Sequence, residues 1–270
     1  MDIREPTEWC SPGFFVPKPA SANVRLVIDY SVINRFIARS PHPFFSARDI
    51  IKQIRPESKW FGCFGSVQGY YQILLEEESR HLTTFLLPQG RFRFKRMPMG
   101  MICSSDFFNF CSDRILEPVP DKVKIGDDGL VQHTEEDSTF SRIREVCKAS
   151  REGNLTLNPK LQVAQEVEFA GYIISADGIK AEPYKLATLH GYPSPQNIQE
   201  LRLFLGAAQQ LAFYIPDLAQ VSAPLRPLLK KSNAFLWMPE HEAAFKAVKK
   251  IISSDLVVKP FDPSLLTHCS

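Results

Sequence analysis

The chain has 270 residues, enough for a substantial core and about two domains of average size. Hydrophobic residues make up 44% and charged residues 23%, which excludes disordered, collagen-like and coiled-coil proteins. The formal net charge of +2 neither favours nor excludes a polyanionic partner. Composition therefore indicates a globular chain and leaves its function open.

Six cysteines are scattered without a C-x-x-C pair or companion histidines at zinc spacing, which favours reduced thiols in an intracellular protein. No apolar run approaches the ~18 residues of a membrane span, and the first residues do not resemble a signal peptide. We therefore expect an intracellular chain, cytoplasmic or nuclear, with no membrane partner and an open oligomeric state. Neither end carries a boundary feature, so we also expect a piece of a longer protein.

Strand signals dominate the first hundred residues. A β-rich segment over 24–30 predicts a strand, and residues 81–87 and 91–97 flank a Pro-Gln-Gly turn and predict a β-hairpin. In the second arm, cationic residues alternate with aromatic ones and share one face: Arg91, Arg93 and Lys95, with Arg96 nearby. This face is a candidate nucleic-acid contact, and the alternative is a solvated surface.

Helical spacing becomes frequent after residue 100. Residues 104–116 predict a helix with Ser104 or Ser105 as its N-cap, and residues 139–153 predict another that ends at Gly153. Strand signals return over 167–174, and a turn follows them.

The last hundred residues read mainly as helices. A helix is predicted over 197–215, where Asn197 and a glutamate three residues later resemble a capping box and a proline ends the pattern. Another helix is predicted over 240–253. Mixed strands and helices followed by a helical part indicate the α+β class.

A pair of aspartates is the most suggestive local motif. Residues 125–131 read Ile-Gly-Asp-Asp-Gly-Leu-Val, and neighbouring residues on a regular strand face opposite sides. Asp127 and Asp128 can share a site only at a tight turn, which the apolar residues on both sides predict. Two hard oxygen ligands at such a tip suit Mg²⁺. Taken alone, however, this motif is more often a solvated β-turn.

Further motifs surround the aspartate pair in a definite order. They include Arg25-Leu26-Val27-Ile28-Asp29-Tyr30, Gly69-Tyr70-Tyr71-Gln72-Ile73, Pro98-Met99-Gly100, Leu157-Asn158-Pro159-Lys160 and Glu200-Leu201-Arg202-Leu203-Phe204-Leu205-Gly206. From about Thr7 to Pro263 this series resembles the reverse transcriptase of gypsy-type long-terminal-repeat (LTR) retrotransposons. The resemblance implies a right-hand polymerase fold with fingers, a palm built on an antiparallel ferredoxin-like sheet, and a helical thumb.

The resemblance also implies a domain organisation. We expect fingers and palm over 1–182, a thumb-like helical region over 183–232, and the truncated start of an RNase H-like domain over 233–270. The first catalytic aspartate of that last domain would come just beyond Ser270, so no RNase H activity is expected from this chain.

Site residues follow from the same resemblance. It assigns Asp127 and Asp128 to catalysis and to the binding of Mg²⁺ or Mn²⁺. Positions that contact the incoming dNTP are Lys18, Arg25, Tyr70 and Asn109, with Tyr70 as the gate against a ribose 2′-hydroxyl. Contacts to the RNA/DNA template–primer would come from Arg91, Arg93, Lys95 and Arg96, and from the hairpin residues Phe169, Gly171 and Tyr172.

One departure from the family pattern decides how much activity we expect. The block that resembles F-S-K-F-D-A-V-Q-G-Y has Gly65 where the third catalytic aspartate belongs. A lost metal ligand should slow the reaction by at least ~10³-fold, roughly 4 kcal/mol of barrier. Gly126 and Gly129 replace apolar residues, and we expect each to loosen the hairpin by about 0.5–1 kcal/mol.

Three functions therefore stay open. The first is a domain with impaired polymerase chemistry that retains nucleic-acid binding. The second is an active RNA-directed DNA polymerase in which another carboxylate substitutes for the missing one. The third is a domesticated or remnant interaction protein that has no catalytic role.

Overall fold

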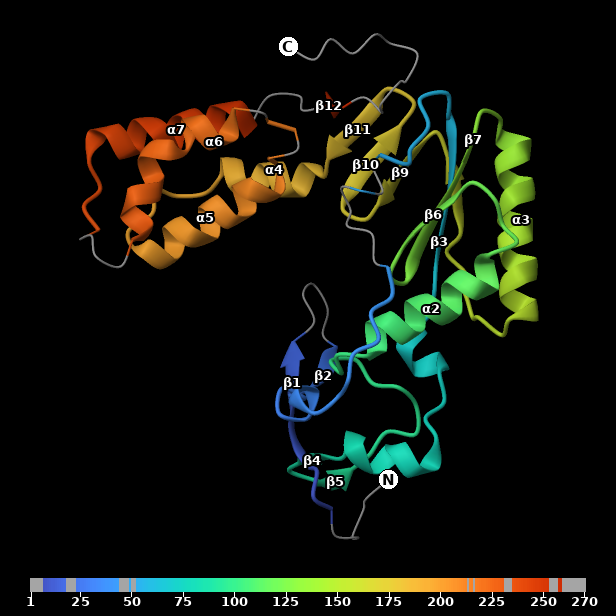
Figure 1. Ribbon diagram of the computed structural model, residues 1–270. Coiled ribbons are helices and arrows are strands. Elements are labelled where there is room, and N and C mark those ends of the chain that lie inside the picture. Colours follow the sequence, from blue (N-terminus) through green and yellow to red (C-terminus); the bar gives the residue numbers. More distant parts are fainter. Residues whose placement is uncertain are drawn as a thin grey trace. The chain divides into compact units, whose positions relative to one another are not determined.

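The computed structural model describes residues 7–17, 23–43, 49, 52–212, 214–215, 217–230, 235–252 and 257–258 (Figure 1). The chain divides into two compact units, each treated by itself below. One unit comprises Met1–Ser46, Gly62–Val131 and Asp137–Gln162, and the other comprises Ala47–Phe61, Gln132–Glu136 and Val163–Ser270. Of the helices in the described part of the chain, none combines the length and the apolar character needed to cross a bilayer.

The first unit begins with a small sheet in the strand order β2-β1-β4-β5. Its strands are β1 (Ser11–Pro17), β2 (Val24–Ile28), β4 (Phe85–Leu87) and β5 (Gly90–Phe92). β1 runs antiparallel to β2 and parallel to β4. Buried apolar residues hold this sheet together, and Tyr30 donates a hydrogen bond from its hydroxyl to the Thr83 carbonyl (3.3 Å). The strand predicted over 24–30 is thus confirmed, two residues shorter.

The predicted hairpin around residue 89 is present but has much shorter arms. Its upstream flank is a 3-10 helix, η3 (Glu77–Thr83), rather than a strand, and the Thr83 hydroxyl donates back to the Arg80 carbonyl (2.8 Å). Downstream, Met97 N donates to the Ile73 carbonyl (2.9 Å), so this segment pairs elsewhere. The continuous alternating arm over 91–97 was therefore a wrong prediction, because non-local backbone pairing ends the strand.

A second sheet has the strand order β6-β7-β3-β8, and Figure 1 labels three of its strands, β3, β6 and β7. Its strands are β3 (Trp60–Gly65), β6 (Lys122–Ile125), β7 (Asp128–His133) and β8 (Gln162–Ala164). α3 (Glu136–Glu152) packs closely on this sheet at Gly62, where an added Cβ would lie 2.8 Å from both Ile143 and Val131. A glycine at that position therefore brings the helix against the strands.

The two helices predicted for this unit are confirmed. α2 spans Ser104–Leu116, and α3 ends where Gly153 N donates to the Ala149 carbonyl (2.9 Å). The predicted N-cap of α2 is wrong, because Cys103 occupies that position without a side-chain cap. Ser104 instead donates its hydroxyl to the Pro98 carbonyl (2.7 Å) and fixes the entry to the helix. Two further 3-10 helices lie in this unit, η1 (Ile33–Arg35) and η2 (Gly69–Gln72).

The second unit contains a sheet in the order β12-β11-β10-β9. The strands are β9 (Glu166–Phe169), β10 (Tyr172–Ser175), β11 (Gly178–Ala181) and β12 (Val257–Val258). The strand signal over 167–174 is two strands, since Ala170 (φ +53°) and Gly171 (φ +80°) make a tight turn in its middle. Positive φ values at both residues of a two-residue loop are typical of a type I′ turn, whose twist matches that of the two strands of a β-hairpin.

Helices dominate the described residues of the second unit after β11. They are α4 (Pro183–His190), α5 (Ile198–Gln210), α6 (Leu218–Val221), the 3-10 helix η4 (Ala223–Leu229) and α7 (Pro239–Ile252). α5 starts as predicted, with the Glu200 amide donating to Asn197 Oδ1 (2.9 Å). It ends at Gln210 rather than near 215, and Pro216 lies outside the described residues. The helix predicted over 240–253 is confirmed by α7.

Candidate active site

The two neighbouring aspartates lie at the tip of a β-hairpin, as their apolar flanks predict. β6 pairs antiparallel with β7, and Ile125 lies opposite Asp128. Gly126 and Asp127 therefore form the two-residue turn, and Gly126 has φ +54°. Glycine adopts this backbone conformation without a Cβ clash, so the sequence here matches the turn that it forms.

Asp127 has a carboxylate oxygen without a partner. Its Oδ1 is inaccessible to solvent and accepts no hydrogen bond. Burial raises the pKa of Asp127, the charge of Asp128 raises it further, and the ammonium of Lys124 opposes both effects. The Asp128 carboxyl lies near β3, and partial burial raises its pKa as well. A buried carboxylate oxygen of this kind is a place where a cation or a donor would bind favourably.

Gly65, the last residue of β3, lies directly beside this pair. A Cβ added to Gly65 would be 2.9 Å from Asp128 Oδ1 and 3.8 Å from the Asp127 carbonyl oxygen. The backbone is fixed there, because Ser66 N donates to the Asp127 carbonyl (2.8 Å) and Asn158 N donates to the Gly65 carbonyl (2.7 Å). A side chain at this position would thus reach the carboxylate pair, while the glycine carbonyl is already engaged.

The two glycines around the aspartates have roles that the sequence did not predict. A Cβ at Gly129 would collide with the ring of Phe64, a residue that is itself buried. Gly126 supplies the positive φ of the turn. The expectation that both glycines merely loosen the hairpin is therefore corrected, since one is required by the turn and the other by the packing of Phe64.

Lys124 is a functional candidate that the sequence reasoning missed. Its Nζ donates to Asn109 Oδ1 (2.9 Å) and to the Gly126 carbonyl (3.2 Å), and lies 3.2 Å from Asp113 Oδ1. Burial lowers the pKa of Lys124, and the charge of Asp113 opposes that effect. The ammonium therefore ties the hairpin tip to α2. The sequence signal that could have indicated this role is a lysine on a predicted strand together with two polar residues, Asn109 and Asp113, spaced i, i+4 on a predicted helix.

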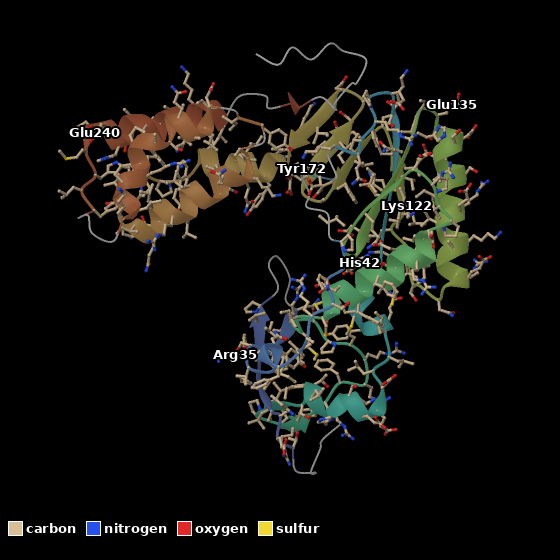
Figure 2. All side chains as sticks on the ribbon, viewed as in Figure 1. Arg35, His42, Lys122, Glu135, Tyr172 and Glu240 are labelled. Carbon is tan, nitrogen blue, oxygen red and sulfur yellow. The ribbon has the colours of Figure 1, made fainter. Side chains whose placement is uncertain are left out.

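A second group of ion pairs anchors the segment around residue 40 to α2. Arg39 contacts Asp106 through two hydrogen bonds (2.6 and 3.1 Å), and the backbone N–H of His42 donates to Asp106 Oδ1 (3.2 Å). His42 Nε2 lies 2.7 Å from Asp113 Oδ2, and Figure 2 shows His42 beside this helix. Asp113 therefore contacts both His42 and Lys124, which connects this segment to the aspartate hairpin.

The predicted dNTP contacts are distributed over the first unit. Tyr70 is on η2, and its hydroxyl lies 3.3 Å from Ser105 Oγ. Arg25 is exposed on β2, and its charge lowers the pKa of Tyr71 in opposition to the larger effect of burial. Asn109 is buried and accepts the hydrogen bond from Lys124. Lys18 lies outside the residues that the structure describes.

The predicted template contacts differ in how they are held. Arg96 donates to the carbonyls of Tyr71 and Gln72 (3.1 and 3.0 Å) and so supports the segment that carries Tyr70. Lys95 is exposed, whereas Arg91 and Arg93 are half-buried. Their role in binding nucleic acid stays a prediction.

The hairpin over Phe169–Tyr172 belongs to the second unit. Phe169 is buried, and Tyr172 packs on Tyr214 with ring centroids 6.0 Å apart (Figure 2). Lys185 donates from Nζ to the Gly171 carbonyl (3.2 Å) at the turn. The predicted hairpin is thus present, and its contact with a primer stays a prediction.

Comparison with known proteins places this chain in a family. The family described as "Reverse transcriptase (RNA-dependent DNA polymerase)" matches residues 16–174, which is more than half of the chain. The chain therefore belongs to the reverse transcriptase family, in the branch of the LTR retrotransposons.

Several transposon polyproteins are similar over nearly the whole chain. The Drosophila melanogaster Pol polyprotein from transposon 297 is 29% identical over 95% of this chain. Those from transposons gypsy and 412 of the same species are 28% and 30% identical over 93% and 96%. The chain spans about a quarter of the length of these relatives, at 25%, 27% and 22%.

Solved structures of foamy viral protease–reverse transcriptase have the same fold. A complex with an RNA/DNA hybrid matches with a TM-score of 0.86 at 19% identity, covering 96% of this chain and 35% of that one. A complex with double-stranded DNA matches with a TM-score of 0.87 at 20% identity, covering 97% and 56%. The chain therefore has the α+β polymerase fold that the resemblance implied.

Proposed function

We propose that this chain is a reverse-transcriptase-like domain that binds an RNA/DNA template–primer and whose nucleotidyl transfer is impaired. The main observation that supports this proposal is the position of Gly65, where a side chain would point at the Asp128 carboxylate. Across the described residues there is no group of three or more His, Cys, Asp or Glu side chains arranged to hold a metal ion.

The residues that are present fit a divalent cation only in part. Asp127 and Asp128 offer hard oxygen ligands, and the unpartnered Oδ1 of Asp127 lies ready for a positive charge. These two residues would hold Mg²⁺ or Mn²⁺, which in phosphoryl transfer stabilises the charge on the attacking and leaving oxygens. Two carboxylates in place of three weaken this arrangement, and we expect a loss in rate of at least ~10³-fold, roughly 4 kcal/mol.

Template binding does not depend on the missing carboxylate. Affinity for nucleic acid comes from many cationic contacts to phosphates and from shape, and so it survives the loss of one metal ligand. The foamy viral relatives were solved with an RNA/DNA hybrid and with double-stranded DNA, which supports the same class of partner here. The dNTP contacts proposed above, including Arg25 and Tyr70, would serve whatever activity remains.

A second candidate is an active RNA-directed DNA polymerase. The unpartnered Asp127 Oδ1 favours it, because that oxygen can still attract a cation at high metal concentration. Both candidate functions share one proposed domain organisation. It consists of fingers and palm over 1–182, a thumb over 183–232 and an RNase H-like start over 233–270. An intracellular location is part of the proposal as well.

Primer extension on an RNA template separates these functions. The native chain, Gly65→Asp and Gly65→Asn are compared in Mg²⁺ and in Mn²⁺, with Asp127→Asn as the inactive reference. We expect little extension by the native chain and an increase of ~10³-fold in Gly65→Asp only, because Asn matches the size of Asp and lacks its charge.

Two further results would decide against the proposal. Strong extension by the native chain that Asp127→Asn abolishes would establish the active polymerase instead. A native chain that neither extends a primer nor retains one in a binding assay would favour the remnant interaction protein. Thermal unfolding with and without Mg²⁺ gives a readout independent of activity, since Gly65→Asp should gain more stability from the ion than Gly65→Asn does.

A further inference from the structure

A basic pocket lies in the helical part of the second unit, between the end of α4 and one side of α7. It has a volume of about 580 Å³. Figure 2 marks Glu240 at the start of α7, and the pocket follows that helix toward its C-terminal end. The charged and aromatic residues that line it are His190, Tyr192, Glu242, Phe245, Lys246, Lys249 and Lys250. Three ammonium groups thus share the pocket with one carboxylate.

Lys249 is held in place within the pocket. Its Nζ donates to the Tyr192 carbonyl (2.9 Å) and lies 5.3 Å from the centre of the Phe245 ring. An ammonium has three N–H donors, so the bond to Tyr192 leaves donor capacity for a ligand. Because its stem and head are fixed, Lys249 loses little side-chain freedom when an anion binds.

Glu242 offsets only part of this positive charge. One of its oxygens accepts hydrogen bonds from Trp237 Nε1 (2.8 Å) and Ser194 Oγ (3.0 Å), and the other lies 3.4 Å from Lys246 Nζ. The bond from Trp237 is the main cause that lowers the pKa of Glu242, so the group is ionised and fully engaged. Among the described residues that line the pocket, three ammonium groups stand against one carboxylate, so the lining carries a net positive charge.

We propose that this pocket binds a phosphate group of a nucleic-acid strand. Ammonium groups are strong phosphate ligands, and a positive concavity raises the local concentration of anions. The aromatic residues are directed elsewhere, since Phe245 is only 2% exposed and the Tyr192 hydroxyl donates to the Glu200 carbonyl (3.2 Å). These two rings therefore offer no stacking platform for a base. Contacts to phosphate carry no sequence information, so the proposed contact is independent of sequence. The inference rests on the proposed nucleic-acid partner.

Salt dependence of strand binding tests this site in the full chain. A labelled single-stranded oligonucleotide is titrated over a range of salt concentrations, and the affinities of the native chain and Lys246→Gln/Lys250→Gln are compared. Arg144→Gln/Lys148→Gln is the matched control, since it removes two exposed cations at the same i, i+4 spacing on α3. Lys249 is left intact because it braces the loop after α4.

Each phosphate contact to a single strand contributes about 0.7 to the slope of log affinity against log salt. We expect the pocket variant to lower that slope by about 0.7–1.4 and the control to leave it unchanged. Equal slopes in both variants would overturn the site while leaving template binding intact. A native chain that binds no strand would remove both this site and the proposed function.

Calorimetric titration with inorganic phosphate at constant ionic strength separates the two sources of the anion. Phosphate binding that is lost in Lys246→Gln/Lys250→Gln, together with the lowered slope, supports the strand contact. The same loss with an unchanged slope would assign the pocket to a free phosphate compound and overturn the strand contact. Circular dichroism of each variant checks that α3 and α7 remain folded.

Discussion

The unpartnered oxygen of Asp127 makes the aspartate tip a source of instability in the absence of a cation. Burial and the charge of Asp128 raise the pKa of Asp127 above its ordinary value of 3.8. The folded state therefore prefers the protonated carboxyl, and folding stability falls as the pH rises from 3.8 through the raised pKa. Above the raised pKa the whole of this cost is present.

Replacing the charge should consequently stabilise the fold. We expect Asp127→Asn to raise the free energy of unfolding at pH 7 by on the order of 1 kcal/mol, because an amide costs less to bury than a carboxylate. The gain should vanish below about pH 3.8, where the native carboxyl is protonated too. Urea unfolding across this pH range measures it, with the exposed Asp177→Asn as control. A gain that persists at low pH would contradict the charge argument.

Elements whose signals are local could be predicted from the sequence. α2, α3, α5 and α7 follow from helical periodicity, and the aspartate hairpin follows from apolar residues around a tight turn. The shortened arm after residue 92 could not be predicted, because it depends on the pairing of Met97 N with the Ile73 carbonyl. The contacts of Lys124 depend likewise on side chains of α2, 15 residues away along the chain in the case of Asn109.

The same contrast applies to the candidate site. Sequence motifs identified Asp127, Asp128 and Gly65, and the structure brings these three together. The role of Gly129 was missed, because it requires knowing that the ring of Phe64 lies over it. A tight turn can be predicted from the residues next to it in the sequence. The space available for a side chain cannot, because it depends on residues that are distant in the sequence and packed nearby in the fold.

The start of α5 offers a test at the level of one element. The Asn197 side chain accepts the Glu200 amide (2.9 Å) and satisfies a helix N-terminal donor that would otherwise lack a partner. We expect Asn197→Ala to lower the free energy of unfolding by about 1 kcal/mol. Gln199→Ala, at an exposed position on the same helix, should change it by less than about 0.5 kcal/mol. Equal effects in urea denaturation would show that the cap contributes nothing specific.

At the scale of the whole molecule, charge is nearly balanced. The chain has 32 Lys and Arg residues and 30 Asp and Glu residues. Attraction to a polyanion must therefore come from local clusters, such as the pocket beside α7, rather than from net charge. The polymerase fold is retained at 19–20% identity to the foamy viral structures.

Binding to a template–primer should accordingly be weak and sensitive to salt. With two to four phosphate contacts, we expect the affinity for an RNA/DNA hybrid to fall by about 10- to 100-fold between about 50 and 200 mM salt. Fluorescence polarisation with a labelled hybrid measures this, and Gly65→Asp serves as a comparison because its new charge lies at the metal site. An affinity that salt does not change would mean that phosphates are not the main contact.

The position of Gly65 has a consequence at the level of the gene. A glycine codon that ends in a pyrimidine becomes an aspartate codon by a single base change. Hydrogen bonds from Ser66 N to the Asp127 carbonyl and from Asn158 N to the Gly65 carbonyl already hold the backbone there. A Cβ at Gly65 would lie 2.9 Å from Asp128 Oδ1, so the Asp128 carboxylate must shift slightly to admit the new side chain. Where the codon of Gly65 ends in a pyrimidine, one point mutation would add the third carboxylate that is missing under the proposed function, within reach of selection in a library of random mutants.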